Sequence, residues 1–203
     1  DYMRVMPPLV DGMNASFHAL NRGKRSLVLD LKNPAGREAL LRLVPKYDVI
    51  VESFRPGVMA KLGLAAETLQ ALHPGLIYCA VSGYGADGPL AKRAGHDLNF
   101  VARGGGLGLT GPADGPPQVS GVQVADIGGA LFAVIGVLAA LSERRTTGKG
   151  RFVDIALSES TVSFGLYGIM NALAGMASPR GEDPLTGGIA PYNTYLSKDG
   201  VPV

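Results

Sequence analysis

Apolar and polar positions follow a strand–helix order along the first half of the chain. Three short, mostly apolar runs predict β-strands at residues 25–32, 47–52 and 76–82. Between them, apolar residues recur every three or four positions and predict helices at residues 35–44, 58–62 and 66–72. Strands that alternate with helices at these intervals are typical of parallel βαβ units. We therefore predict an α/β fold with a Rossmann-like parallel sheet and flanking helices.

The second half of the chain is more apolar and is interrupted by a glycine-rich stretch. Residues 96–102 predict a short helix, and residues 104–120 predict a loop. The apolar run at residues 127–141 is shorter than the roughly 20 residues of a membrane span. We therefore expect a buried helix there and no membrane partner. The remaining predictions are a strand at 152–157, a long apolar helix at 159–177, a strand at 192–197, and an irregular segment at 1–22.

Composition narrows the class of protein. The chain has 203 residues, of which 46% are hydrophobic, so it can bury a sizeable core. Its net charge is +2 and the positive residues are scattered, which argues against a nucleic-acid partner. The single cysteine, Cys79, excludes an internal disulfide and suits a reducing, cytoplasmic location. Because the chain starts at an aspartate and stops directly after a turn-like KDG, we expect a piece of a longer protein.

Cationic residues follow the predicted strands where parallel sheets bind ligands. In open parallel sheets the ligand lies at the carboxyl ends of the strands, here residues 30–32, 53–55 and 82–85. Lys32, Arg55 and Lys61 lie at or near these ends. They are either ordinary solvated charges or contacts to a phosphate group, which arginine matches in geometry.

The sequence GLGLTG at residues 106–111 has the glycine spacing of a dinucleotide-binding loop. That loop requires a strand before it and a helix after it. Here a predicted helix precedes it and the proline-containing sequence PADGPP follows. We interpret this stretch as a flexible glycine loop that can lie against a substrate.

Two polar residues flank the glycine-rich stretch and are candidates for catalysis. Asp126 precedes an apolar helix, where aspartate is a favoured N-cap. A carboxylate held ionised at a helix N-terminus can also act as a nucleophile or base. His96 is either a surface or capping residue or an acid/base group, since imidazole titrates near neutrality. Its neighbour Asp97 would fix the tautomer of His96 or cap the next turn. No group of residues has the spacing of a metal site, so we predict no metal.

Several of these segments together resemble the family III CoA-transferases, which include formyl-CoA and carnitine CoA-transferases and α-methylacyl-CoA racemases. The resemblance is carried by the order and spacing of NRGKRSLVLDLKNPAGR, VIVESFRPGVMAKLGL, GYGADGP, RAGHDLNF, GLTGPADGPPQ, VADIGG and LAALSERRTTGKGRFVDIAL. It implies part of the family's large domain over residues 1–177, with a linker helix, and the start of a smaller domain over 178–203. It also implies an interlocked homodimer that binds acyl-CoA as substrate and needs no prosthetic group.

The resemblance also implies a role for individual residues. Asp126 matches the family's catalytic aspartate, and His96 matches the histidine of a GHD motif in the racemases. Lys61 stands where relatives often carry arginine, so it keeps the charge but loses the two-pronged geometry. The expected CoA contacts are Leu29, Asp30, Leu31, Lys32, Ser53, Phe54, Arg55, Lys61, Arg93 and Asp97.

Three functions fit these residues. Because of His96, we favour a racemase that moves the α-proton of a 2-methylacyl-CoA through an enolate, with His96 and Asp126 on opposite faces. The alternative is a CoA transferase in which Asp126 attacks the thioester and forms an acyl-aspartyl anhydride. A third possibility is a CoA-binding protein without catalytic activity.

Overall fold

The computed structural model describes residues 2–202 of the chain. Its contacts divide the chain into two compact units, Asp1–Arg37 and Glu38–Val203, and each is described by itself. The predicted domains, residues 1–177 and 178–203, are a different division of the chain and stay a prediction.

The first unit contains short elements where the sequence predicted an irregular segment, so that prediction was wrong. A 3₁₀ turn, η1 (Tyr2–Val5), precedes an antiparallel hairpin of β1 (Leu9–Val10) and β2 (Met13–Asn14), and α1 (Ala15–Leu20) follows. The hairpin turns through Asp11-Gly12, whose φ angles are 50° and 78°. An Asp-Gly pair with positive φ is a strong hairpin signal, and it was overlooked.

Residues 25–32 do not form the predicted strand. Among the described residues, no strand pairs with this segment. An extended segment without a neighbour leaves its backbone N–H and C=O groups to water, so its apolar pattern is not enough to make a strand. Leu27 and Val28 accordingly stay 64% and 91% exposed.

The helix that follows begins as the sequence predicted. The Asn33 side chain accepts a hydrogen bond from Ala35 N (2.9 Å) directly ahead of α2 (Pro34–Leu43), and the turn η2 (Val44–Lys46) succeeds it.

A parallel sheet forms the centre of the second unit and confirms the predicted fold class. Its order is β3–β4–β5, with β3 at Val49–Glu52, β4 at Ile77–Ser82 and β5 at Phe152–Ala156. Both pairings are parallel. The central strand β4 is the most buried, and Ile77 and Cys79 have no exposed surface. The short helices α3 (Val58–Lys61) and α4 (Ala66–Leu72) connect β3 to β4, as predicted.

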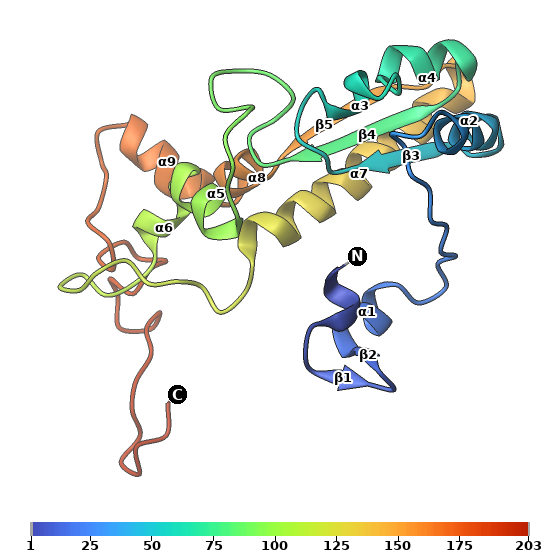
Figure 1. The fold of residues 1–203 in the computed structure, drawn as a ribbon. Coiled ribbons are helices and arrows are strands. Elements are labelled where there is room, and N and C mark those ends of the chain that lie inside the picture. Colours follow the sequence, from blue (N-terminus) through green and yellow to red (C-terminus); the bar gives the residue numbers. More distant parts are fainter. Residues whose placement is uncertain (1, 203) are drawn as a thin grey trace. The chain divides into compact units, whose positions relative to one another are not determined.

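Helices lie on both faces of this sheet (Figure 1). On one face, Tyr78 and Phe152 line a hollow together with Met59 and Ala66 of α3 and α4. On the other face, α7 (Val124–Thr147) lies against β4 and β5. A Cβ added to Gly136 of α7 would lie 2.7 Å from Val153 Cγ1, so the glycine permits this close packing.

Helix α7 is longer and less buried than predicted. It has 24 residues, starts three residues before the predicted range, and leaves one apolar face exposed. Length and composition alone would also suit a membrane span, but its other face packs against the sheet. The burial prediction failed because nothing among the described residues covers the outer face. Its exposed side chains are Ile127, Leu131, Val134, Ile135 and Leu138.

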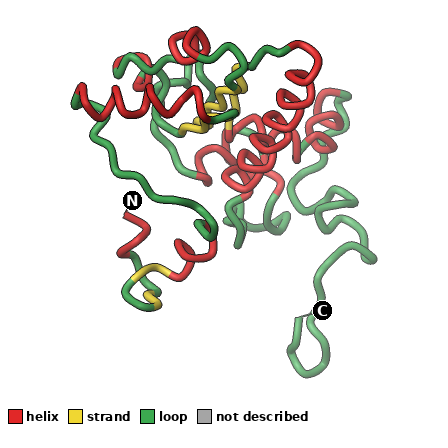
Figure 2. Tube along the Cα trace, turned by 90° about the vertical axis from the view of Figure 1, so that its right-hand side faces the viewer, coloured by secondary structure: helices red, strands yellow, loops and turns green. Residues whose placement is uncertain are grey.

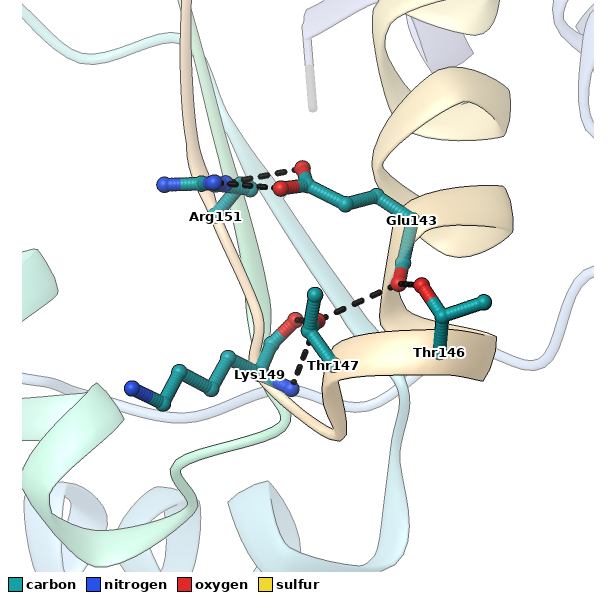
Figure 3. Close-up of polar contacts among 5 residues, drawn as sticks. All are labelled: Glu143, Thr146, Thr147, Lys149 and Arg151. Carbon is teal, nitrogen blue, oxygen red and sulfur yellow. Dashed lines mark hydrogen bonds and ion pairs between the residues drawn. The ribbon is translucent and has the colours of Figure 1, made fainter.

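The C-terminal end of α7 is joined to the start of β5 (Figure 3). Gly148 takes a left-handed conformation (φ 68°) that ends the helix. The Glu143 carbonyl accepts hydrogen bonds from the hydroxyls of Thr146 (2.9 Å) and Thr147 (3.1 Å). The Glu143 carboxylate accepts two more from Arg151, one of them from Nε at 2.8 Å. These contacts fix the helix relative to the sheet at the end away from its N-terminus.

The other predicted elements of the second half were partly right. Helix α5 (Asp97–Arg103) is present, and the predicted loop after it contains a short helix, α6 (Gly106–Leu109). The long helix predicted at residues 159–177 is divided into α8 (Leu157–Phe164) and α9 (Leu166–Leu173) at Gly165, because glycine favours helix ends over interiors. The strand at residues 192–197 is wrong: Figure 2 draws the chain beyond α9 as loop, with one isolated bridge between Leu196 and Pro202.

Candidate active site

A pocket of about 590 Å³ opens at the carboxyl ends of β3 and β4. This is where parallel sheets bind ligands. The structure brings both candidate catalytic residues and four of the predicted CoA contacts to this pocket. These six are Ser53, Phe54, Arg55, Arg93, His96 and Asp126.

The remaining predicted contacts do not line this pocket. Asp97 lines a smaller, mostly apolar cavity on another face of α5, and Lys61 is the exposed last residue of α3. Leu29, Asp30, Leu31 and Lys32 belong to the first unit. Their role in binding stays a prediction.

His96 lies where the chain enters α5. It is the N-cap residue, with extended backbone (φ −128°, ψ 176°), and its backbone N–H donates to Asn99 Oδ1 at 3.0 Å. The side chain is exposed at the pocket wall. The backbone is therefore fixed by the helix start while the imidazole can reach a bound ligand.

Packing of Phe100 holds the start of α5 in place. This ring is 5% exposed and makes an edge-to-face contact with Tyr84 at 5.1 Å between centroids. A Cβ on Gly83 would overlap the Phe100 ring, and one on Gly95 would lie 2.7 Å from Phe100 Cε1. Only glycine lets these two segments approach the ring so closely. The loop after β4 and the residue before His96 are thus positioned by one aromatic side chain.

Asp126 is the third residue of α7 rather than its N-cap, which corrects the sequence prediction. The helix begins at Val124, and Gln123 is the N-cap residue, without a side-chain capping bond. The cap comes from α5 instead: Asp97 Oδ1 accepts hydrogen bonds from Ala125 N (2.8 Å) and Asp126 N (3.0 Å). Because its first N–H groups are satisfied from outside, α7 starts before Asp126, which lines the pocket.

The electrostatics of Asp126 also differ from the expectation of a strongly ionised carboxylate. Its pKa is raised above the ordinary value of 3.8. Partial burial is the main cause, because desolvation disfavours the charged form. The negative Asp97 raises the pKa further, while His96 lowers it. A carboxyl with a raised pKa is better suited to exchange a proton than one fixed in the charged state.

Two further polar residues line the pocket and were not predicted as site residues. Ser82, at the end of β4, has a buried hydroxyl oxygen without a hydrogen-bond partner among the described residues. Its position at the end of a predicted strand is the sequence feature that could have identified Ser82 as a site residue. Asn99 lies three residues after His96, and this capping-type spacing could have identified it.

Residues 1–203 match CoA-transferase family III along their whole length. The chain belongs to CoA-transferase family III. This family III chain is 42% identical to α-methylacyl-CoA racemase from Homo sapiens over 191 residues, which is 93% of this chain and 50% of that protein. It is 36% identical to succinyl-CoA:glutarate CoA-transferase from Mus musculus over 194 residues, covering 96% of this chain and 44% of that one.

A solved structure confirms the fold of this family III chain. A CAIB/BAIF family protein from Brucella suis superposes with a TM-score of 0.88 at 42% sequence identity, over 98% of this chain and 54% of the other. The chain spans about half the length of the curated relatives it matches. Racemases and CoA-transferases thus both occur among the relatives of this chain, at similar sequence identity.

Proposed function

We propose that the full-length protein is a 2-methylacyl-CoA racemase that moves the α-proton through an enolate. The observation that carries this proposal is that His96 and Asp126 come from different helices and line one pocket at the sheet edge. Two acid/base groups in one pocket are what a proton exchange between the two faces of a carbon requires. The 42% identity to a racemase from Homo sapiens supports the same function.

His96 and Asp126 exchange the roles of acid and base when the direction of the reaction reverses. The α-carbon of a thioester is weakly acidic because the enolate spreads its charge onto the carbonyl oxygen. In one direction Asp126 removes the proton and protonated His96 returns one to the opposite face; in the other direction the roles reverse. Neighbouring backbone N–H groups would stabilise the enolate oxygen. The raised pKa of Asp126 supports this role, because it brings the acid and base forms closer in free energy.

The rest of the pocket supports binding of the CoA moiety as part of the substrate, without a prosthetic group. Arg55 and Arg93 supply positive charge where the phosphates would lie, and Ser53 and Phe54 complete that wall. We place Leu29–Lys32 and Lys61 in the same binding role on the resemblance alone. The same resemblance leads us to propose an interlocked homodimer in the cytoplasm and the domain division at residue 177.

A CoA transferase is the second candidate, favoured by relatives such as the succinyl-CoA:glutarate CoA-transferase from Mus musculus. In that reaction the Asp126 carboxylate attacks the thioester carbonyl and CoA leaves as the thiolate. An incoming carboxylate then displaces the donor acid from the acyl-aspartyl anhydride, which gives a new anhydride between the acceptor and Asp126. The CoA thiolate attacks the acceptor's carbonyl, so the new acyl-CoA forms and the Asp126 carboxylate is released. His96 would then only position the thioester.

Incubation of the full-length protein with a 2-methylacyl-CoA in deuterated water separates the two functions. A racemase incorporates α-deuterium without any acceptor acid and interconverts the two epimers. Absence of exchange, together with transfer of CoA to added carboxylates, would overturn the racemase proposal and support the transferase.

A further inference from the structure

One carboxylate connects the two helices that carry His96 and Asp126. Asp97 is the first residue of α5, adjacent to His96, yet its Oδ1 accepts hydrogen bonds from Ala125 and Asp126 at the start of α7. The donors lie 28 and 29 residues further along the chain. Ala125 has no exposed surface and packs in one cluster with Phe100 and Val101 of α5. The two helix starts therefore form one packed and hydrogen-bonded unit.

From this geometry we propose that Asp97 is a positioning residue that sets both the place and the proton affinity of Asp126 relative to His96. The inference rests on the proposed function, because it assumes that Asp126 reacts. The position of Asp126 follows from the two hydrogen bonds, because they tie the start of α7 to Asp97, the residue next to His96. The proton affinity follows from charge, since a second carboxylate nearby disfavours ionisation of the first.

Few charged or titratable groups surround Asp126, so the effect of Asp97 on its proton affinity can be tested. Asp97 and His96 act on it from α5, in opposite directions. Arg55 and Arg93 line the same pocket from loops. On α8, which also packs against α7, the single titratable residue Glu159 is exposed and does not line the pocket. Of these groups, only Asp97 is both hydrogen-bonded to the Asp126 backbone and negatively charged.

The two contributions of Asp97 can be separated by two substitutions. Asp97→Asn keeps an oxygen that can accept both hydrogen bonds but removes the charge. Asp97→Ala removes both. In the full-length protein, we expect Asp97→Asn to keep kcat within about threefold at its own pH optimum and to move the acidic limb of the pH–rate profile to lower pH. We expect Asp97→Ala to lower kcat by about ten- to a hundredfold with little change in KM, because Asp126 is displaced.

Asp154→Asn is the matched control. Asp154 Oδ2 also accepts a hydrogen bond from a distant backbone group, Ala86 N at 2.9 Å, but the residue does not line the pocket. Its substitution should leave the pH–rate profile unmoved. A profile for Asp97→Asn that coincides with that of the unsubstituted protein would overturn the proposal, as would equal kcat values for the Asn and Ala variants. If the proposed racemase function is itself wrong, the result is different: the unsubstituted protein will show no α-deuterium exchange.

Discussion

The two ends of the pocket hold their reactive groups by different means. At the α5 end, His96 is an exposed N-cap residue whose position depends on packing of Phe100 against Gly83 and Gly95. At the α7 end, Asp126 is also exposed, but its backbone N–H is bonded to Asp97, and its pKa is raised by desolvation and by the charge of Asp97. The α5 end is therefore held by packing together with one hydrogen bond to Asn99, and the α7 end by hydrogen bonds to Asp97 and by charge. Substitutions that alter volume should act on the first, and substitutions that alter charge on the second.

The largest effect is expected at the α7 end. Asp126→Asn keeps the size of the side chain but removes the group that both proposed reactions require. We expect turnover in the full-length protein to fall by about a thousandfold or more, because acid/base or nucleophilic action is lost. The measurement is the initial rate of α-deuterium incorporation and of CoA transfer.

Asp183→Asn is a suitable comparison for that variant. Asp183 accepts a hydrogen bond from Leu185 N at 3.0 Å and lies outside the pocket. The Asp183→Asn variant should keep the turnover rate of the unsubstituted protein. Retained turnover in Asp126→Asn would mean that Asp126 is not the reacting group of either proposed reaction.

The next largest effect is expected at the α5 end, and it distinguishes the two enzymes. His96→Gln should reduce interconversion of the two epimers by about a hundredfold, because the second acid/base group is lost. Transferase activity, if the protein has it, should change much less, since His96 does not react there. The exposed His18 lies in the other unit, and His18→Gln should change neither rate. Epimer interconversion that persists in His96→Gln would show that another residue returns the proton.

Local sequence pattern was sufficient for the three strands of the parallel sheet, and it marked His96 and Asp126 as candidates whose catalytic role stays a prediction. The strands at β3, β4 and β5 and the helices α3 and α4 follow from apolar spacing, and their carboxyl ends mark the pocket. The pattern at residues 25–32 is equally strand-like but forms no strand, because a strand depends on a neighbour as well as on its own residues.

Contacts between distant segments were the part that sequence could not supply. Asp126 has the local pattern of an N-cap, yet α7 starts earlier because Asp97 provides the cap across a separation of 29 residues. The raised pKa of Asp126 follows from desolvation and from the negative charge of Asp97, neither of which a local pattern encodes. The division of residues 159–177 at Gly165 was readable in principle, since glycine weakens a helix interior.

A moderate effect is expected when the packing at the α5 end is disturbed. In Gly83→Ala the new methyl group would overlap the Phe100 ring. We expect a loss of about 1–3 kcal/mol in the free energy of unfolding from overpacking, and a two- to tenfold lower kcat, roughly, because α5 carries His96. Thermal unfolding and exchange rates measure the two effects. Gly108→Ala meets nothing within 4 Å and should alter neither; equal behaviour of the two variants would contradict positioning by Phe100.

The smallest effect concerns stability and tests the charge at the α7 end. The folded state raises the pKa of Asp126 above 3.8, so it binds the proton more tightly than the unfolded state does. Ionisation of Asp126 therefore destabilises the fold: the penalty is absent below pH 3.8 and fully present above the raised pKa. The partial positive charge of the α7 N-terminus offsets part of this penalty without reversing it.

Asp126→Asn removes that penalty, so at pH 7 it should raise Tm by about 1–2 °C, and the gain should shrink as the pH falls toward 4. The same substitution made in an Asp97→Asn background should raise Tm less, because the neighbouring negative charge is already gone. Differential scanning calorimetry of the four proteins over this pH range gives the coupling between the two residues. A Tm gain that is independent of pH and of Asp97 would mean that the carboxylates do not interact, and the α7 end would then be held by hydrogen bonds alone.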